Sequence, residues 1–402
     1  MKYIIILGDG MSDHAIDKLH GKTPLMVANT PNIDALCAKS KTGKLITVPA
    51  EFPAGSEVAN LGVLGYDVNK VYQGRGVLEA ASMGVELEDT DLAMRCNLIC
   101  LEDEKIKNHS AGHISTIEAS SLIAMLNQKL GSDTVTFHPG VSYRHLLVIK
   151  NGINDITCTP PHDVPGKPFM DVMVEETTPE GTDTACKLNE LILESQKLLS
   201  EHPINQARIQ KGKDPANSIW PWAPGYKPQM ETFQERFGIS GATISAVDLI
   251  KGIGIYAGMK AIEVVGATGL HDTNYEGKAR AAIDALKEVD LIYLHIEASD
   301  EAGHEGDVDL KIRTIEYLDE RVVKYIVEET AKLDDESVAI AILPDHPTPC
   351  ETRTHDYDPV PFMIYKPGVQ GDDVTEYNEE ALEKGSYGVL KGDEFIRNLL
   401  QD

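Results

Sequence analysis

Residues 3–10 read Tyr-Ile-Ile-Ile-Leu-Gly-Asp-Gly, a short apolar run that ends in a Gly-Asp-Gly turn. A run of this length suits a strand that is buried on both faces of a sheet. Similar runs occur at Ala261–Val265, Leu291–Ile296 and Val338–Leu343, and helical patterns occupy residues 280–289 and 309–333. Strands that alternate with helices predict an α/β fold with a mostly parallel sheet and helices on both faces.

The middle of the chain has a different texture. It contains an alternating run at Tyr143–Ile149, a proline-rich loop at residues 159–165 and one clear helix at Thr184–Ser200. We interpret residues 93–214 as an inserted α+β cap domain, and residues 1–92 and 215–402 as the catalytic domain. The chain is expected to re-enter the main sheet near Ser218–Trp222.

Composition restricts the class of partner. The formal net charge of −27 argues against nucleic acid, and no apolar run approaches the roughly 20 residues that cross a membrane. The six cysteines include no Cys-x-x-Cys pair, which predicts reduced thiols and a cytoplasmic location. If the partner is a small phosphorylated metabolite, bound metal ions or a few well-placed Arg and Lys side chains must offset the overall negative charge.

Acidic and histidine residues follow three of the predicted strands. Because parallel strands bind ligands beyond their carboxyl ends, these side chains are expected to converge on one crevice. Three carboxylates and three imidazoles are enough to bind two divalent ions, and mixed ligands of this kind suit zinc or manganese better than magnesium or calcium. The candidates are Asp9, Asp300, His304, Asp345, His346 and His355.

A candidate nucleophile precedes another predicted helix. Pro53-Ala54-Gly55-Ser56 is a turn that delivers a serine hydroxyl to the start of a helix. Metal coordination would lower the pKa of that hydroxyl, and the N–H groups at the helix start would bind phosphate oxygens. Ordinary helix capping by Ser56 is an equally simple interpretation of this stretch.

Several segments together resemble the archaeal-type, cofactor-independent phosphoglycerate mutases of the alkaline phosphatase superfamily. They occur in the family's order and span nearly the whole chain, at residues 6–11, 53–56, 295–304, 344–350, 355 and 358–361. The resemblance implies an alkaline-phosphatase-like sheet and a phosphoserine on Ser56, with interconversion of 3-phosphoglycerate and 2-phosphoglycerate. It also implies two divalent ions, Mn²⁺ or Zn²⁺ before Co²⁺ or Mg²⁺. One would be held by Asp9, Ser56, Asp345 and His346, and the other by Asp300, His304 and His355.

Basic residues are expected to complete a substrate site. Lys278 lies in a stretch that also resembles the family, and Arg75 and Arg144 suit bidentate binding of phosphate or carboxylate. Surface salt bridges are an equal alternative for these three residues. Near His109 and His113 the family commonly has arginine before and after an Ala-Gly pair, so titratable groups replace fixed charges here.

Other functions remain open from the sequence. Related proteins of the family resemble phosphotransferases that act on homoserine, and water in place of the acceptor would make the same site a phosphatase or sulfatase. A cap that excludes water would distinguish a mutase from a hydrolase. A metal-stabilised binding protein would need no serine at its ions. A P-loop kinase is excluded, since Gly21-Lys22-Thr23 has no glycine five residues before Gly21.

Overall fold

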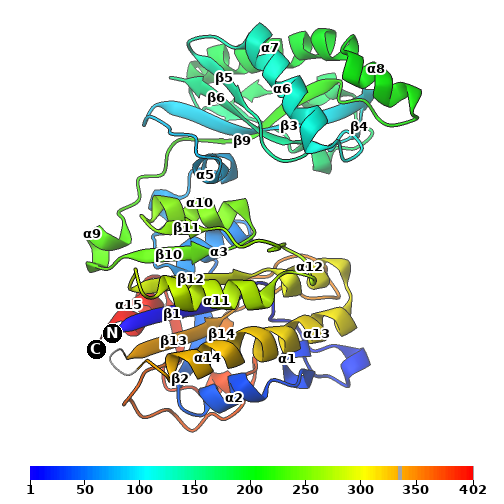
Figure 1. Ribbon diagram of the computed structural model, residues 1–402. Helices are drawn as coiled ribbons and strands as arrows, with labels where there is room; N and C mark the ends of the chain where they lie inside the picture. Colours follow the sequence, from blue (N-terminus) through cyan, green and yellow to red (C-terminus); the bar gives the residue numbers. More distant parts are fainter. Residues whose placement is uncertain (334–336, 402) are drawn as a thin grey trace. The chain divides into compact units, whose positions relative to one another are not determined.

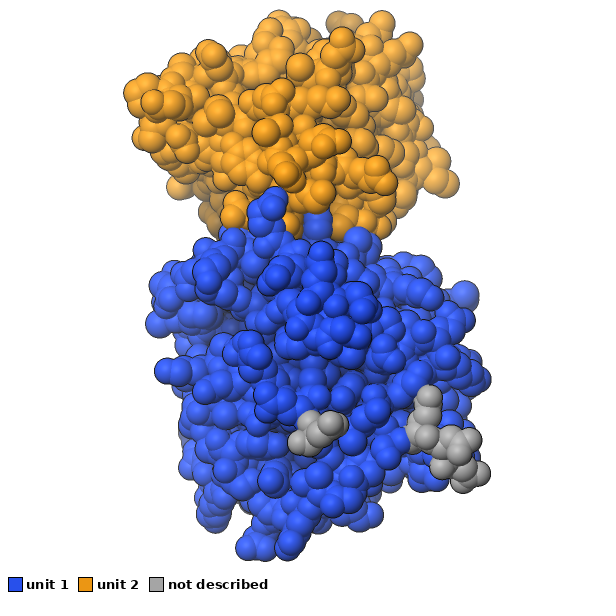
Figure 2. Space-filling view, turned by 90° about the vertical axis from the view of Figure 1, so that its left-hand side faces the viewer, with its two compact units in different colours: residues 1–72, 229–402 blue, residues 73–228 orange. Residues whose placement is uncertain are grey.

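The computed structural model describes residues 1–333 and 337–401. The chain forms two compact units, one made of residues 1–72 and 229–402 and the other of residues 73–228 (Figure 2). The second unit is therefore an insertion in the sequence of the first. Each unit has its own sheet and its own hydrophobic core. None of the helices in the described ranges is long and apolar enough to cross a membrane.

An eight-stranded sheet forms the centre of the first unit (Figure 1). Among the strands that the structure describes, most neighbours are parallel, and only the strand at residues 360–365 runs antiparallel to both of its neighbours. The mostly parallel α/β sheet expected from the sequence is confirmed. In spatial order the strands are β11 (Lys260–Ile262), β10 (Gly241–Ile244), β12 (Leu291–Ile296), β1 (Lys2–Gly8), β13 (Val338–Leu343), β14 (Val360–Tyr365), β2 (Lys41–Ile46) and β15 (Val389–Lys391).

Helices cover both faces of this sheet (Figure 1). Ile292 and Leu294 of β12 pack into the core on one face. Tyr293 points to the other face, where its hydroxyl donates to Asn60 Oδ1. The first face carries α1 (Pro24–Val27), α2 (Pro31–Cys37), α11 (Tyr275–Ala285), α13 (Val308–Leu318) and α14 (Lys324–Thr330), and the second carries α3 (Ser56–Val63), α10 (Asp248–Tyr256) and α15 (Glu394–Leu400). Shorter helices are α4 (Val68–Val71) and α9 (Phe233–Phe237), while α12 (Ala298–Glu305) follows β12.

Two predictions about these elements need correction. The run at Ala261–Val265 is not a buried strand: β11 lies at the edge of the sheet, and Val265 is 93% exposed. The fully buried strand beside it is β10, which the sequence analysis missed. The helix expected at residues 309–333 is interrupted by a π-helical turn at Asp319–Val323, where Asp319 accepts hydrogen bonds from Ile33 N and Asn32 Nδ2 at the start of α2.

The second unit is built around one long strand, β3 (Asp91–Glu102), which pairs antiparallel with three others. Its core lies between this sheet and two helices, α6 (Thr116–Leu130) and α7 (Thr182–Ser200). The strand expected at Tyr143–Ile149 is β6, and the helix expected at Thr184–Ser200 is α7, so both expectations are confirmed. The remaining elements are β4 (Lys105–Asn108), β5 (Val135–His138), β6 (Arg144–Lys150), β7 (Ile156–Thr157), β8 (Glu175–Glu176), β9 (Ser218–Gly225), α5 (Arg75–Ser82) and α8 (Pro203–Gln210).

The predicted domain boundaries at residues 92/93 and 214/215 differ from the observed units. Residues 218–222 do not return to the main sheet, because β9 pairs with β3 from Ala93 to Ile99. Helix α5 packs on β3 and β9. These contacts place residues 73–92 and 215–228 in the second unit.

Candidate active site

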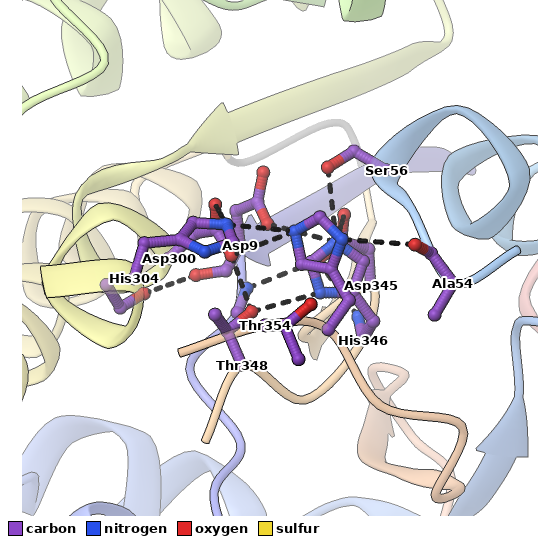
Figure 3. Close-up of polar contacts among 12 residues, drawn as sticks. Asp9, Ala54, Ser56, Asp300, His304, Asp345, His346, Thr348 and Thr354 are labelled. Carbon is purple, nitrogen blue, oxygen red and sulfur yellow. Dashed lines mark hydrogen bonds and ion pairs between the residues drawn. The ribbon is translucent and has the colours of Figure 1, made fainter. Parts of the chain in front are cut away.

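The carboxyl ends of three neighbouring strands carry most of the predicted ligands (Figure 3). Strands β12, β1 and β13 are adjacent in the sheet. Asp9 follows β1, Asp345 and His346 follow β13, and α12 presents Asp300 and His304 one turn apart. Because parallel strands end at the same edge, side chains from distant parts of the sequence meet there.

One half of the site surrounds the imidazole of His346. Its Nε2 atom lies 3.1 Å from Ser56 Oγ, 3.4 Å from Asp345 Oδ2 and 3.7 Å from Asp9 Oδ1. The side chains of Asp9, Asp345 and His346 are almost completely buried. Three segments, the first turn of α3 and the loops after β1 and β13, thus bring together the four residues assigned by resemblance to the first ion.

The other half contains two histidines and one carboxylate. His304 Nε2 lies 3.2 Å from Asp300 Oδ2 and 3.0 Å from His355 Nε2, and His355 Nε2 lies 3.7 Å from Asp300 Oδ1. The opposite ring atoms face carbonyl oxygens: His304 Nδ1 lies 3.0 Å from Arg353 O, and His355 Nδ1 lies 3.2 Å from Ala54 O. Carbonyls only accept hydrogen bonds, so each Nδ1 carries a proton and each ring turns its Nε2 atom towards Asp300.

Electrostatics in this crevice favour additional positive charge. Burial and the charge of Asp345 raise the pKa of Asp9 well above its usual value. Asp9 Oδ1 is buried and has no hydrogen-bond partner among the described residues. The hydrogen bond to Asp300 raises the pKa of His304 to about 9, which means that positive charge is favoured between this ring and the carboxylate. The donor set therefore fits divalent cations, and Asp300, His304 and His355 form one compact ligand group.

Thr348 joins the two halves. Its hydroxyl donates to Asp300 Oδ1 and lies 3.2 Å from His346 Nδ1. The rings of His346 and His355 are also close, with centroids 4.0 Å apart. A second compact ligand group, made of Asp9, Asp300 and His346, spans both halves. All seven predicted ligands therefore belong to one continuous site within the first unit.

Ser56 occupies the first position of α3 and does not cap it. Gly55 is the N-cap residue, with no side-chain hydrogen bond to the helix. The Ser56 hydroxyl instead faces His346 (Figure 3). The capping interpretation of this serine is wrong, and its side chain is directed towards the candidate metal ligands.

Three buried side chains that the sequence analysis did not select support this arrangement. Asn60 Nδ2 donates to Asp345 Oδ2 and to Ser56 O, at 2.8 Å each, and its Oδ1 accepts from Tyr293. His295 Nε2 lies 2.9 Å from Asp9 Oδ2. The sequence feature that could have revealed these residues is the pair Tyr293 and His295, two polar side chains in an otherwise apolar strand. In a sheet covered on both faces, such side chains need buried partners.

Comparison with known proteins identifies the family. Residues 37–205 match the family described as 2,3-bisphosphoglycerate-independent phosphoglycerate mutase. A protein of that name from Methanosarcina acetivorans is 51% identical, with 100% of both chains covered. The chain belongs to the 2,3-bisphosphoglycerate-independent phosphoglycerate mutase family. The resemblance recognised in the sequence is thus confirmed.

Solved structures of similar proteins extend over the same length. A protein from Pyrococcus horikoshii has a TM-score of 0.84 and 32% identity, with 99% of this chain and 97% of that chain covered. The cofactor-independent phosphoglycerate mutase from Thermoplasma acidophilum has a TM-score of 0.71 and 26% identity, with 100% and 99% covered. Both units of this chain therefore have counterparts within the mutase family.

The predicted substrate residues of the second unit lie in one cluster. The ring of Tyr143 contacts His109, with centroids 5.5 Å apart, and His113, at 6.3 Å. The Arg144 guanidinium lies 5.7 Å from the centre of the same ring. Arg75 Nε is 3.3 Å from Glu79, at the start of α5. The structure thus groups three of the four residues directly around Tyr143.

Arg95, His162 and Trp222 extend this basic cluster. The Arg95 guanidinium stacks 4.6 Å from the Trp222 ring and pairs with Glu79 at 3.1 Å, so that it shares this carboxylate with Arg75. His162 lies between His109 and Trp222, with ring centroids 6.0 and 5.1 Å away. The sequence analysis missed these residues because antiparallel pairing brings them together from β3, β9 and a loop.

The loop that carries His109 and His113 has an unusual backbone. Ala111, Gly112 and His113 are consecutive left-handed residues, with φ angles of 49°, 62° and 51°. Asn108 Oδ1 accepts from Gly112 N at 2.9 Å, and the buried Arg208 donates to Ala111 O at 2.7 Å. Non-glycine residues hold this conformation only where their surroundings impose it, and such strain clusters at functional sites.

Lys278 does not fit its predicted role as an accessible phosphate ligand. Its side chain is completely buried, and Nζ donates to His295 O at 3.2 Å. Burial lowers the pKa of the Lys278 ammonium to about 8. A phosphate ligand must be accessible to substrate, whereas α11 packs Lys278 against β12.

A buried ion pair holds the two central ligand loops together. Lys311 Nζ lies 2.8 Å from Asp13 Oδ2, and both side chains are completely buried. The same ammonium donates to Ser12 O at 3.0 Å and to Thr348 O at 2.8 Å. It therefore links the loop that carries Asp9 to the loop that carries His346.

The change Lys311→Met is expected to lower the free energy of unfolding by about 3–5 kcal/mol, because Asp13 would remain buried without its partner. Urea denaturation of the variant and the parent measures this loss. Lys18→Met is the matched control, since it removes an exposed pair with Asp309 at 2.9 Å. The control should change stability by less than about 1 kcal/mol. Equal effects of the two changes would contradict a structural role for the buried pair.

Proposed function

We propose that this protein interconverts 3-phosphoglycerate and 2-phosphoglycerate through a phosphoserine on Ser56, with two divalent ions at the site. The observation that carries the proposal is the Ser56 hydroxyl, 3.1 Å from His346 Nε2 and grouped with six Asp and His ligands. Homologues that share about half of their residues with the chain are named as mutases of this kind. A cytoplasmic location is part of the same proposal.

The ligand chemistry supports Mn²⁺ or Zn²⁺ more than Mg²⁺, since three of the seven candidate ligands are histidines. Asp9, Ser56, Asp345 and His346 would hold one ion, and Asp300, His304 and His355 the other. When bound, such ions neutralise phosphoryl oxygens and lower the pKa of an attacking hydroxyl. The orphaned Asp9 Oδ1 and the facing Nε2 atoms of His304 and His355 support this assignment.

The remaining steps depend on the chain itself. Ser56 Oγ attacks phosphorus and loses its proton, while the substrate oxygen that leaves becomes a hydroxyl group. The reverse transfer to the neighbouring hydroxyl gives the isomer, so no nucleotide is consumed. Ser56 is held at the start of α3, where the helix N-terminus favours phosphate oxygens, and Asn60 fixes the same turn to Asp345. This arrangement fixes the nucleophile before substrate binds.

We assign recognition of the carboxylate or phosphate of the substrate to the basic cluster of the second unit, including Arg75, His109, His113 and Arg144. Positive and titratable groups gathered around Tyr143 support this role. Burial and the neighbouring His162 and His113 lower the pKa of His109, so that it is neutral near pH 7. A neutral imidazole binds an anion less strongly than arginine does. This observation keeps homoserine, whose free form has no net charge, as the second candidate substrate.

Metal-loaded protein supplied with 3-phosphoglycerate is expected to form 2-phosphoglycerate, measured through a coupled enolase reaction. In a parallel reaction, homoserine and ATP should give little or no phosphohomoserine. Efficient formation of phosphohomoserine with negligible isomerisation would overturn the mutase proposal but leave the Ser56 site intact. Release of inorganic phosphate as the main product would instead indicate a phosphatase.

A further inference from the structure

His295 is a buried histidine beside the candidate metal site and is not one of its predicted ligands. It lies on β12, and its side chain is completely buried. Its Nε2 atom is 2.9 Å from Asp9 Oδ2, and its Nδ1 atom is 3.1 Å from Ser245 Oγ. Ser245 Oγ also accepts a hydrogen bond from Val247 N at 3.0 Å. The imidazole therefore bridges the end of β10 and the first ligand of the site.

The partners of His295 fix the position of its proton. Asp9 as an ionised metal ligand has only acceptor atoms, so the contact at Oδ2 requires a proton on His295 Nε2. A neutral imidazole then has its lone pair on Nδ1, where the Ser245 hydroxyl donates. His295 Nε2, His295 Nδ1 and Ser245 Oγ each have a hydrogen-bond partner, which fixes the orientation of the imidazole ring.

This hydrogen bond orients the carboxylate of Asp9 and leaves Oδ1 as its free oxygen among the described residues. Oδ2 is used by His295, and the backbone of Asp9 is held by Ser299 Oγ, which donates to Asp9 O at 2.6 Å. Oδ1 is the atom without a hydrogen-bond partner in the described part of the chain, and it faces His346 Nε2 at 3.7 Å. His295 thus selects which carboxylate oxygen faces the other ligands.

We propose that His295 is a positioning residue that orients Asp9 towards one of the two ions. This is the ion that Ser56, Asp345 and His346 would also hold, and His295 does not position a ligand of the other ion. The inference rests on the proposed two-ion function. The group that would hold the other ion, Asp300, His304 and His355, has its own supports, since both histidines face carbonyl oxygens and Asp300 is held by Thr348. No hydrogen bond between this group and His295 is present in the described ranges. Removal of the hydrogen-bond donor at position 295 should therefore weaken the binding of one ion more than the binding of the other.

The variants His295→Leu and His295→Gln separate hydrogen bonding from packing. Leucine fills the space but cannot donate, whereas the glutamine amide can donate from nearly the position of Nε2. Mn²⁺ binding to metal-free protein is measured by calorimetry and by electron paramagnetic resonance, which also reports the coupling between two neighbouring Mn²⁺ ions. The parent protein should bind two ions with a coupled spectrum.

We expect His295→Leu to bind one Mn²⁺ as the parent does and the other about 10–100-fold more weakly, which is the usual effect of losing a partner that orients a ligand. The coupled signal should then disappear at Mn²⁺ concentrations that saturate the tighter ion. His295→Gln should recover most of the affinity and the coupled signal. Ser245→Ala, which removes the partner of Nδ1, should weaken the same ion to a smaller extent.

His145→Leu is the matched control for loss of a buried imidazole. His145 is 3% exposed and lies in β6 of the second unit, where Nδ1 accepts from Gly140 N at 3.0 Å. This variant should bind both ions as the parent does. Two Mn²⁺ ions bound to His295→Leu with parental affinity would overturn the inference, as would equal weakening of both ions or failure of glutamine to restore binding.

Other outcomes separate this inference from the proposed function. A parent protein that binds no Mn²⁺ or Zn²⁺ would overturn the two-ion function itself. If His295→Leu does not fold, Ser245→Ala and His295→Gln still decide the inference. Unchanged binding in Ser245→Ala together with a loss in His295→Gln would show that proton donation to Asp9 is not what His295 contributes.

Discussion

Ser56→Ala is expected to reduce phosphoryl transfer by about 10³-fold or more, the scale seen when an enzyme loses its covalent nucleophile. The substitution removes the oxygen that lies 3.1 Å from His346 Nε2 and leaves the six Asp and His ligands in place. Divalent ions should therefore still bind. Isomerisation of 3-phosphoglycerate measures the loss, and mass spectrometry of protein mixed with substrate should detect a phosphoserine only in the parent.

A second serine provides the control for this substitution. Ser115 is the N-cap residue of α6 in the second unit, since its hydroxyl accepts from Glu118 N. Ser115→Ala should cost about 1 kcal/mol of stability, as loss of an N-cap typically does, and leave turnover unchanged. Normal turnover in Ser56→Ala would show that the mechanism has no covalent step at this residue.

The grouping of the candidate metal ligands could be predicted from sequence because topology alone brings these residues together. Asp9, Asp300 and Asp345 each come shortly after a buried parallel strand, and such strands end at one edge of the sheet whatever their separation in sequence. No knowledge of side-chain packing was needed for this step. His355 lies on a loop after β13 and was predicted from the resemblance as well as from its residue type.

The supporting residues could not be predicted in the same way. The roles of His295 and Asn60 depend on their partners, Asp9 and Tyr293, which are 286 and 233 residues away in sequence. Lys278 was misassigned because lysine is almost never fully buried, and its sequence gives no sign of this exception. Burial and pairing of this kind are properties of the packed structure.

Antiparallel pairing explains the errors in the second unit. The boundary at residues 214/215 was placed too early because one partner of β3 is β9, which follows it by more than a hundred residues. The same pairing aligns Arg95 with Trp222 and completes the basic cluster. Alternating apolar residues indicate that a strand exists, but they do not identify its neighbour.

Removal of divalent ions is expected to abolish turnover and to lower the melting temperature. Without ions, the buried carboxylates of Asp9 and Asp345 repel each other, which contributes to the raised pKa of Asp9. Bound cations offset this repulsion and stabilise the folded state in proportion to the logarithm of their concentration. Extensive dialysis against a chelator, followed by calorimetry and the coupled enolase assay, measures both losses.

Restoration separates loss of ions from damage to the protein. Mn²⁺, Co²⁺ or Zn²⁺ added to the chelated protein should recover turnover and melting temperature together. The same ions would support both catalysis and folding, through one ligand group that contains Asp9 and His346 and another that contains His304 and His355. Dialysis against the same buffer without chelator is the matched control and should change neither. Full turnover in protein shown by elemental analysis to be free of metal would refute the two-ion proposal. Recovery of stability without turnover would mean that the bound ions support the fold and that the catalytic role belongs elsewhere.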